Sequence, residues 1–214
     1  MPKVKARRTY DSSLRKQQAS QTRMRILDAA QRLFADKGYP ATTVEAVATE
    51  AGVAVDTVYA TFGSKRGVLQ VLLNVRVGGD EAELDLLARA GPQAVQREPD
   101  QRAQLAAFVA DVSSIVERAR PVDDIIRGAA AVDADIAAFR GENEAYRYRN
   151  MRQLVAWLAA KGPLRTGLTE DDAAAIVWAM TSPEVHGKLR VGRGWTAERY
   201  AAWLRESLTR ILLP

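Results

Sequence analysis

Apolar residues recur at intervals of three and four along nearly the whole chain, which is the spacing of one buried face on an α-helix. The alternation of β-branched and polar residues that is typical of a half-buried strand does not persist in any segment. The first clear apolar stripe consists of Ile26, Leu27, Ala30, Leu33 and Phe34. It predicts a helix that ends near Gly38, and the pattern as a whole predicts an all-α protein.

Two short helices and a longer one follow. Pro40 prevents direct continuation of the first helix, and Thr42 with Glu45 three residues later predicts a capping box that opens a short helix. Gly52 is expected to end that helix, and the pattern of residues 55–61 predicts another short one. Ser64 is the expected N-cap of a longer helix. The longer helix carries Val68, Leu69, Leu72 and Leu73 on one side.

The rest of the chain predicts a second helical layer after breaks at Gly91, Pro92 and Pro99. We expect one helix over 100–119, a second that has Pro121 in its first turn, and a third over about 132–160. A fourth begins at Thr169 and is interrupted or kinked at Pro183, and the last runs from Thr196 to the carboxyl end.

Positive charge is concentrated at the amino-terminal end. Residues 1–66 contain 12 Lys or Arg and 6 Asp or Glu, whereas the remainder contains 19 and 20, for a chain total of +5. This asymmetry indicates that one part of the molecule meets a polyanion, or that the chain simply begins with a basic tail.

Composition excludes several classes. No apolar run approaches the roughly 20 residues that span a bilayer, so we expect no membrane partner, and the basic start lacks the apolar segment of a secretory signal. The chain has no cysteine, which excludes disulfides, thiolate metal ligands and cysteine nucleophiles. These observations favour a cytoplasmic location.

Residues 43–61 contain two short helices joined by a tight glycine turn, the dimensions that place a second helix in a DNA major groove. Tyr59 and Thr61 are expected to face outward, and Lys65 follows the Ser64 cap as a candidate phosphate clamp. A generic helical hairpin would share the glycine turn, so the spacing leaves both interpretations open. The expected inner packing surface comprises Val44, Val47, Ala48, Val53 and Val58.

The residues of this region resemble the amino-terminal signature of the TetR (TetR/AcrR-type) family. The matching positions are Arg25-Ile26-Leu27-Asp28-Ala29-Ala30, Leu33-Phe34, Gly38-Tyr39, Thr42-Thr43-Val44, Ala48, Ala51-Gly52-Val53, Thr57-Val58-Tyr59, Phe62 and Ser64-Lys65. The carboxy-terminal stretch 168–213 resembles, less specifically, an effector domain common in that family. The resemblance implies a repressor-type regulator whose homodimer binds a palindromic double-stranded DNA operator and releases it when a small effector binds.

The resemblance also implies residue roles. Phosphate contacts are carried over to Thr43, Tyr59, Thr61 and Lys65, and the positions nearest the bases to Val55, Asp56, Thr57 and Ala60. Asp56 stands where a small residue is common in the family, and Glu45 where some members have a basic residue. Asp56 either accepts a hydrogen bond from a cytosine amino group or complements the positive end of its own helix.

The implied organisation has three parts: a basic flexible tail (1–18), a three-helix helix-turn-helix DNA-binding head (19–66) and a helical-bundle effector-binding and dimerisation body (67–214). Candidate ligand contacts in the body are Phe108, Tyr148, Met151, Trp157 and Trp178, with Tyr146 and Met180 in the same group. Helical spacing accounts for them equally well as core residues. Arg127, Arg147 and Arg152 either neutralise an acidic effector or form a solvated face.

The last helix predicts a dimer interface. Its apolar stripe consists of Tyr200, Trp203, Leu204, Leu208, Ile211 and Leu212. Two carboxy-terminal helices, over 169–191 and 196–213, would form a four-helix bundle with their symmetry mates. The alternative is that the stripe packs wholly inside its own subunit.

No catalytic residues, metal ligands or cofactors are predicted. His186 is a lone histidine that suits a structural or interfacial role, and the acidic run 170–172 fits the first turn of a helix. A ligand-responsive DNA-binding regulator therefore explains the chain best. A constitutive DNA-binding or architectural protein and, least favoured, an all-α enzyme are the alternatives.

Overall fold

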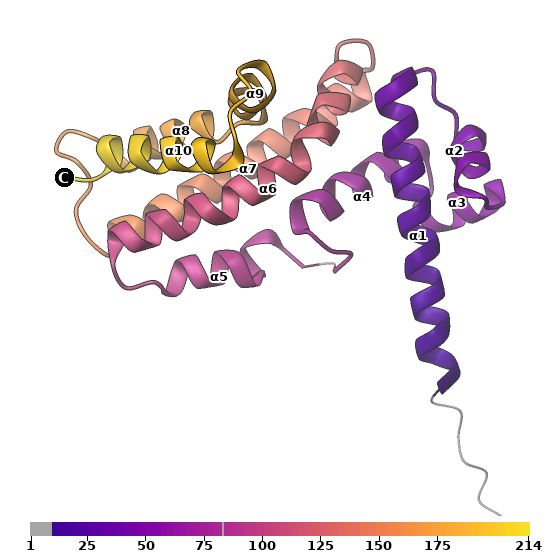
Figure 1. Ribbon diagram of the computed structural model, residues 1–214, viewed down its shortest axis with the longest axis horizontal. Helices are drawn as coiled ribbons and strands as arrows, with labels where there is room; N and C mark the ends of the chain where they lie inside the picture. The colour runs from indigo at the N-terminus through magenta and orange to yellow at the C-terminus, as the bar shows by residue number, and fades with distance from the viewer. Residues whose placement is uncertain (1–9, 83) are drawn as a thin grey trace, which may run out of the picture. The chain divides into compact units, whose positions relative to one another are not determined.

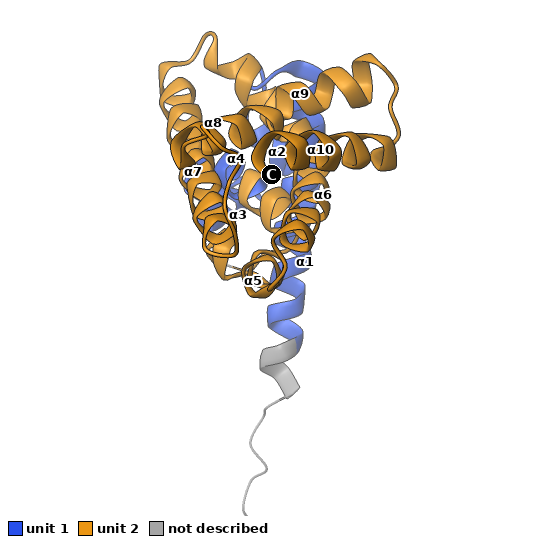
Figure 2. Ribbon diagram, turned by 90° about the vertical axis from the view of Figure 1, so that its left-hand side faces the viewer, with its two compact units in different colours: residues 1–72 blue, residues 73–214 orange. Residues whose placement is uncertain are grey.

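The computed structural model describes residues 10–82 and 84–214, and within these ranges every regular element is helical (Figure 1), which confirms the all-α prediction. The chain forms two compact units, Met1–Leu72 and Leu73–Pro214 (Figure 2). In the described part of the chain, no helix combines the length and apolar character needed to cross a membrane.

The amino-terminal unit consists of α1 (Tyr10–Lys37), α2 (Val44–Ala51), α3 (Val55–Phe62) and the beginning of α4 (Lys65–Gly78). The predicted stripe of the first helix is the core of this unit, because Ile26, Leu27 and Ala30 are fully buried and Phe34 is 2% exposed. Helix α1 packs along α2, and α2 packs on α3.

Helix α1 starts earlier than the sequence analysis placed it. Residues 10–18, assigned there to a flexible tail, belong to the helix, while residues 1–9 of that tail lie outside the described residues. The segment from Tyr10 to Lys37 contains no glycine or proline. A helix nucleated by the buried part of α1 can therefore propagate toward the amino terminus, gaining one hydrogen bond for each residue added.

The predicted capping box at Thr42 is wrong by one residue. Thr43 is the N-cap of α2, and its hydroxyl oxygen accepts a hydrogen bond from the Ala46 N–H. Thr42 is 1% exposed, and its hydroxyl lies within hydrogen-bond distance of two carbonyl oxygens, that of Gly38 at 2.9 Å and that of Leu33 at 3.1 Å. Thr42 thus ties the α1–α2 connection together rather than opening α2.

The carboxy-terminal unit contains the end of α4 and all later elements. These are the short 3₁₀ turn η1 (Leu86–Ala88), α5 (Ala90–Arg97), α6 (Gln101–Ala130), α7 (Ala134–Ala159), α8 (Glu170–Met180), α9 (Pro183–Gly187), the π-helical turn η2 (Lys188–Gly192) and α10 (Ala197–Leu212). Helix α6 is central: it packs against α5, α7, α9 and α10, and α7 in turn packs against α8. The predicted caps Thr169 and Thr196 are confirmed by hydrogen bonds from the backbone N–H groups of Asp172 and Arg199.

The prediction that Pro121 lies in a first turn is wrong. Helix α6 runs without interruption from Gln101 to Ala130 with Pro121 inside it. Proline removes the backbone hydrogen bond to the carbonyl four residues earlier, that of Glu117. Burial on both sides of Pro121 offsets that cost, because Ala119, Val122 and Ile126 are at most 7% exposed.

Candidate nucleic-acid interface and ligand cavity

Helices α2 and α3 are joined by a tight turn at Gly52. Gly52 has a positive φ of 65°, and its N–H bonds to the carbonyls of Ala48 and Thr49, which ends α2. Val53 N–H bonds to the Ala48 carbonyl at 3.0 Å, and α3 starts two residues later. The expected inner surface is confirmed for Val44, Val47, Ala48 and Val58, which are buried, whereas Val53 is only half-buried.

The exposed face of α3 carries most of the candidate DNA contacts. Asp56, Tyr59, Ala60 and Thr61 are exposed, with Tyr59 at 45%, while Val55 and Thr57 are half-buried. Thr61 Oγ1 donates to the Thr57 carbonyl at 2.7 Å, so its hydroxyl must rotate before it can donate to a phosphate. The face therefore offers one large amphipathic side chain, Tyr59, among small ones.

Thr43 differs from Thr61 in its hydrogen bonding. Its hydroxyl oxygen accepts the Ala46 N–H at 3.1 Å, so the hydroxyl hydrogen is directed by no backbone carbonyl. Because a hydroxyl has one hydrogen and two lone pairs, Thr43 can cap α2 and donate to an anion at the same time.

Lys65 is held by the protein itself. Its Nζ donates to the carbonyl oxygens of Tyr39 and Thr42, each at 2.9 Å, and lies 4.3 Å from the centre of the Tyr39 ring. The ammonium group thus closes the α1–α2 connection onto the start of α4. A clamp role toward phosphate remains a prediction, and these contacts give Lys65 a structural role as well.

Replacing Lys65 by methionine is expected to lower the free energy of unfolding by about 2 kcal/mol, because two buried carbonyls lose a charged donor while the aliphatic stem is kept. Chemical denaturation measures this effect. Lys37→Met is the control, because Lys37 is exposed in the last turn of α1. Equal stability of the two variants would contradict the structural role of Lys65.

A cavity of about 150 Å³ lies in the carboxy-terminal unit. Its walls come from α5, α6, α7, residues 73–77 of α4, the turn η1, and Thr181 and Pro183, at the end of α8 and the start of α9. The apolar lining includes Leu73, Val77, Val95, Phe108, Val112, Val116, Met151, Leu154 and Trp157, and the polar lining includes Asp111, Asp123, Arg140, Asn143, Glu144, Arg147 and Asn150.

Three of the five candidate ligand residues line this cavity, namely Phe108, Met151 and Trp157. The structure does not bring the other two into it. Tyr148 donates its hydroxyl to Asp171 at 2.9 Å, and Trp178 donates Nε1 to Glu144 at 3.0 Å. Their rings meet edge to face with centroids 6.3 Å apart, so they stabilise the α7–α8 packing.

Apart from Arg147, the charged and amide side chains of this lining were missed by the sequence analysis. Asp123 is the informative example, since it follows Val112, Val116 and Ala119 at helical spacing and precedes Ile126. A carboxylate inside an otherwise apolar stripe is the signal that could have identified it. Asp111 begins the same stretch of α6.

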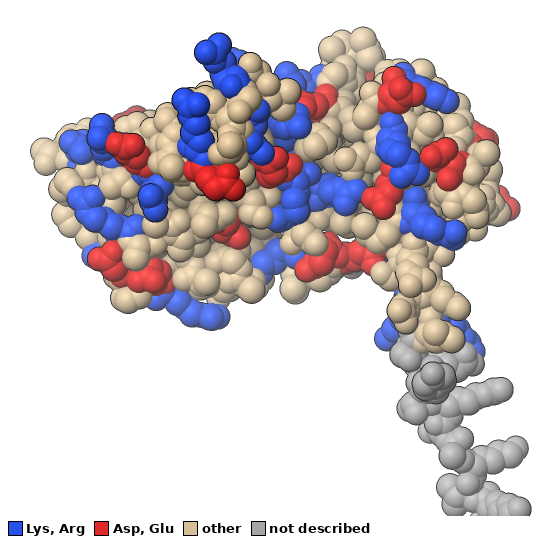
Figure 3. All heavy atoms as spheres, in the orientation of Figure 1, with Lys and Arg blue, Asp and Glu red and all other residues tan. Residues whose placement is uncertain are grey.

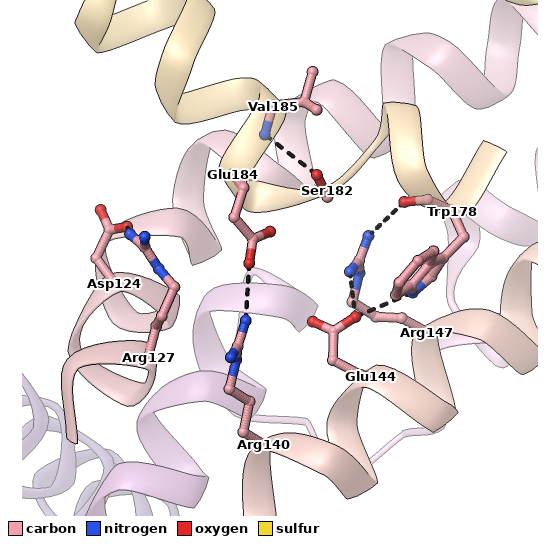
Figure 4. A network of polar contacts seen from close by, with 9 residues as sticks. All are labelled: Asp124, Arg127, Arg140, Glu144, Arg147, Trp178, Ser182, Glu184 and Val185. Atoms are coloured by element: carbon pink, nitrogen blue, oxygen red, sulfur yellow. Dashed lines mark hydrogen bonds and ion pairs between the residues drawn. The ribbon is translucent and has the colours of Figure 1, made fainter. Parts of the chain in front are cut away.

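The arginines proposed for an acidic effector are engaged within the protein (Figure 4). Arg147 donates to Glu144 at 2.8 Å and to the Trp178 carbonyl at 3.1 Å, and Arg127 pairs with Asp124. Arg152 is exposed and lies 3.7 Å from Asp171. The solvated-face interpretation therefore fits Arg127 and Arg152, while Arg147 belongs to the polar lining of the cavity.

Burial dominates the electrostatics of the two aspartates. It raises the pKa of Asp123 to about 6, with the carboxylates of Glu184 and Glu144 adding to the increase and Arg140 and Arg147 opposing it. Burial also raises the pKa of Asp111, against the attraction of Arg118. Neither carboxylate is compensated enough to keep an ordinary pKa.

The prediction that the stripe of α10 is a dimer interface is wrong for four of its members. Leu204, Leu208 and Leu212 are fully buried and Tyr200 is 1% exposed, all within the core of one chain. Ile211 is 37% exposed and Trp203 is half-buried. The hydrophobic period reports a buried face correctly but does not tell which surface buries it.

The histidine and the acidic run fit the structural roles that the sequence suggested for them. His186 is 1% exposed, its Nε2 lies 3.0 Å from Glu117 Oε2, and burial lowers its pKa. The run 170–172 occupies the first turn of α8. Over the described ranges, no three His, Asp or Glu side chains form a group that could hold a metal ion.

Comparison with known proteins agrees with the geometry of α1 to α4. Residues 26–72 match the family described as "Bacterial regulatory proteins, tetR family". The similarity to this family is therefore established for α2, α3 and the adjoining parts of α1 and α4. A curated relative, the uncharacterized helix-turn-helix-type transcriptional regulator YvkB of Bacillus subtilis (strain 168), is 43% identical over 53 residues, which are 25% of this chain and 28% of that protein.

Two solved structures of regulators share the fold over most of this chain. The secondary repressor NalD of the MexAB-OprM multidrug efflux pump in Pseudomonas aeruginosa has a TM-score of 0.68 at 22% identity and covers 92% of this chain and 98% of its own. A transcriptional regulator from Saccharomonospora viridis, solved in complex with choline, has a TM-score of 0.65 at 19% identity, with 90% and 97% covered.

Proposed function

We propose that the chain is a transcriptional regulator that binds an operator through α3 and is released from it by a small molecule bound in the cavity. The observation that carries this proposal is the exposed face of α3, at the position of a recognition helix in a helix-turn-helix unit. A repressor role is supported by the shared fold with NalD, which is a repressor.

Helix α4 supports coupling between the two activities. It begins at Lys65, in the amino-terminal unit, and its residues Leu73 and Val77 line the cavity. Arg89 and Arg118 donate to its last carbonyls, those of Gly78 and Val77. A ligand that displaces this end of α4 moves a helix that also carries Lys65, a candidate DNA contact, and a coupling of about 1 to 3 kcal/mol suffices for release.

Selection of bound fragments from the host genome tests operator binding directly. Tyr59→Phe is then expected to lower affinity for the selected operator about tenfold, since it removes a hydroxyl donor from a phosphate in each half-site. The melting temperature should not change, because Tyr59 is exposed. Tyr148→Phe is the matched control, because Tyr148 lies on α7 in the carboxy-terminal unit. Fluorescence anisotropy over a salt series measures both variants, and equal losses would contradict a role for Tyr59 on DNA.

A palindromic operator requires a homodimer, for which the surface of α8 and α10 is the candidate interface. Large apolar side chains that stay partly exposed on these helices include Ile176 on α8 and Trp203 and Ile211 on α10. Trp203, Ser207 and Ile211 follow one another at intervals of four, so they share one face of α10.

Replacing Ile211 by glutamate is expected to give folded monomers, because Ile211 is 37% exposed in one chain and would be buried only in the dimer. Arg205→Glu, at an exposed position of the same helix, is the control and should remain dimeric. Light scattering with circular dichroism separates the outcomes. A dimeric Ile211→Glu variant would place the interface elsewhere.

A further inference from the structure

The ionisable side chains that line the cavity carry an excess of negative charge. Its wall contains the carboxylates of Asp111, Asp123 and Glu144 and the guanidinium groups of Arg140 and Arg147. The chain as a whole carries +5, and basic and acidic side chains are interspersed over the face drawn in Figure 3. Residues 67–214, which contain the cavity, are close to neutral with 19 basic and 20 acidic side chains, so the excess at the cavity rests on these five side chains alone.

Both guanidinium groups are already neutralised. Arg147 Nη1 donates to Glu144 Oε2 at 2.8 Å, and Arg140 Nη2 donates to Glu184 Oε1 at 2.9 Å (Figure 4). Glu144 Oε2 also accepts the Trp178 Nε1–H at 3.0 Å. These two ion pairs leave no net positive charge to attract an anionic ligand.

The carboxylates left over are Asp111, which is attracted by Arg118, and Asp123. The Oδ2 atom of Asp123 is buried and has no hydrogen-bond partner among the residues that the structure describes. Its neighbours on the buried face of α6 are apolar, since Val122 and Ile126 are at most 2% exposed and Ala119 is 7% exposed. A buried carboxylate without a partner is costly to the folded protein, and a ligand that supplies a positive charge with an N–H donor removes that cost.

A second open group lies on the same wall. Arg140 Nε is also buried with no acceptor in the described part of the chain. Since Glu184 neutralises the guanidinium charge, Arg140 Nε needs an acceptor oxygen and not a second anion. This atom favours a ligand with a hydroxyl or carbonyl oxygen beside its positive charge.

We propose that this cavity binds a small organic cation, with its protonated amine on Asp123 and its hydrocarbon part among the apolar side chains of α6 and α7. The proposal rests on the proposed function only in treating the cavity as the effector site. The volume of about 150 Å³ limits the hydrocarbon part to about one aromatic ring, because engineered apolar cavities of about that size take up benzene.

Three probes with one framework and different charge test the proposal: benzylamine, benzyl alcohol and benzoate. Calorimetry on the full chain without DNA, at pH 7.5, is expected to show benzylamine binding at least tenfold more tightly than benzyl alcohol, and benzoate most weakly. Equal affinities, benzoate binding best, or no binding of any probe at millimolar concentration would each overturn it. Because no DNA is present, these outcomes are independent of operator binding.

Asp123→Asn is expected to abolish the preference for benzylamine while benzyl alcohol still binds, which shows that the cavity is intact. Asp111→Asn is the matched control. Asp111 lies on the same helix, twelve residues and therefore about 18 Å away along its axis, and should keep the preference. Loss of the preference in Asp111→Asn alone, or its persistence in Asp123→Asn, would overturn the assignment to Asp123.

The pH dependence provides a second readout. Burial is the main cause of the raised pKa of Asp123, about 6, and the carboxylates of Glu184 on α9 and Glu144 on α7 add to it. Arg140 and Arg147 of α7 oppose the increase. Benzylamine competes with a proton for Asp123, so its affinity should fall as the pH is lowered through about 6, and benzyl alcohol should show no such fall. A flat profile for benzylamine would contradict the ion pair.

Discussion

Replacing Leu204 by glutamate is expected to unfold the carboxy-terminal unit. Leu204 is fully buried in the core that α10 shares with α6 and α8. A glutamate at this position places an unpaired charge in an apolar core, which costs several kcal/mol, comparable to the roughly 5 to 15 kcal/mol that stabilise a typical domain. Circular dichroism and chemical denaturation measure the loss.

Arg205→Glu is the control. It introduces the same side chain at the next position along α10, which is exposed. A well-folded Leu204→Glu monomer would show that α10 leaves the core easily and that its stripe is the dimer surface, as the sequence pattern suggested. The contrast with Ile211→Glu separates the two roles of α10, because burial within one chain predicts unfolding and burial between chains predicts dissociation.

The elements of the fold could be predicted where local chemistry decides them. The Ser64, Thr169 and Thr196 caps each accept a backbone N–H three residues later, as their positions in the sequence indicated. The glycine turn at Gly52 likewise depends on one residue with a positive φ. Such features depend on neighbours in the chain, so the sequence contains the information directly.

Features that depend on distant contacts could not be predicted in this way. Pro121 stands inside α6 because tertiary burial outweighs its local cost, and Tyr148 and Trp178 meet each other rather than the cavity. Lys65 suited a phosphate clamp by its place after a cap, but the carbonyls that it contacts lie 26 and 23 residues earlier. Each of these outcomes needs the tertiary structure.

Asp123→Asn is expected to stabilise the protein at neutral pH. A folded-state pKa of about 6, against an ordinary value of 3.8, means that the folded chain holds this proton more tightly than the unfolded chain. Ionisation of Asp123 therefore destabilises the fold as the pH rises from about 3.8 to about 6, and the penalty is complete above that range. A shift of about two pH units corresponds to at most about 3 kcal/mol.

Asparagine has nearly the same shape and no charge, so the variant should gain most of that amount at pH 7.5 and nothing below the ordinary pKa of aspartate. Denaturation of both proteins at pH 7.5 and pH 3.5 measures the difference, with Asp124→Asn as the control at the neighbouring position. Asp124 pairs with Arg120 and Arg127, so its replacement should not stabilise the protein.

A gain in stability at neutral pH in Asp123→Asn, together with loss of the preference for a cation, is the trade of stability for binding that is typical of a functional site. A loss of stability at pH 7.5 would instead show that the Asp123 carboxylate makes a stabilising interaction in the folded protein and has a structural role.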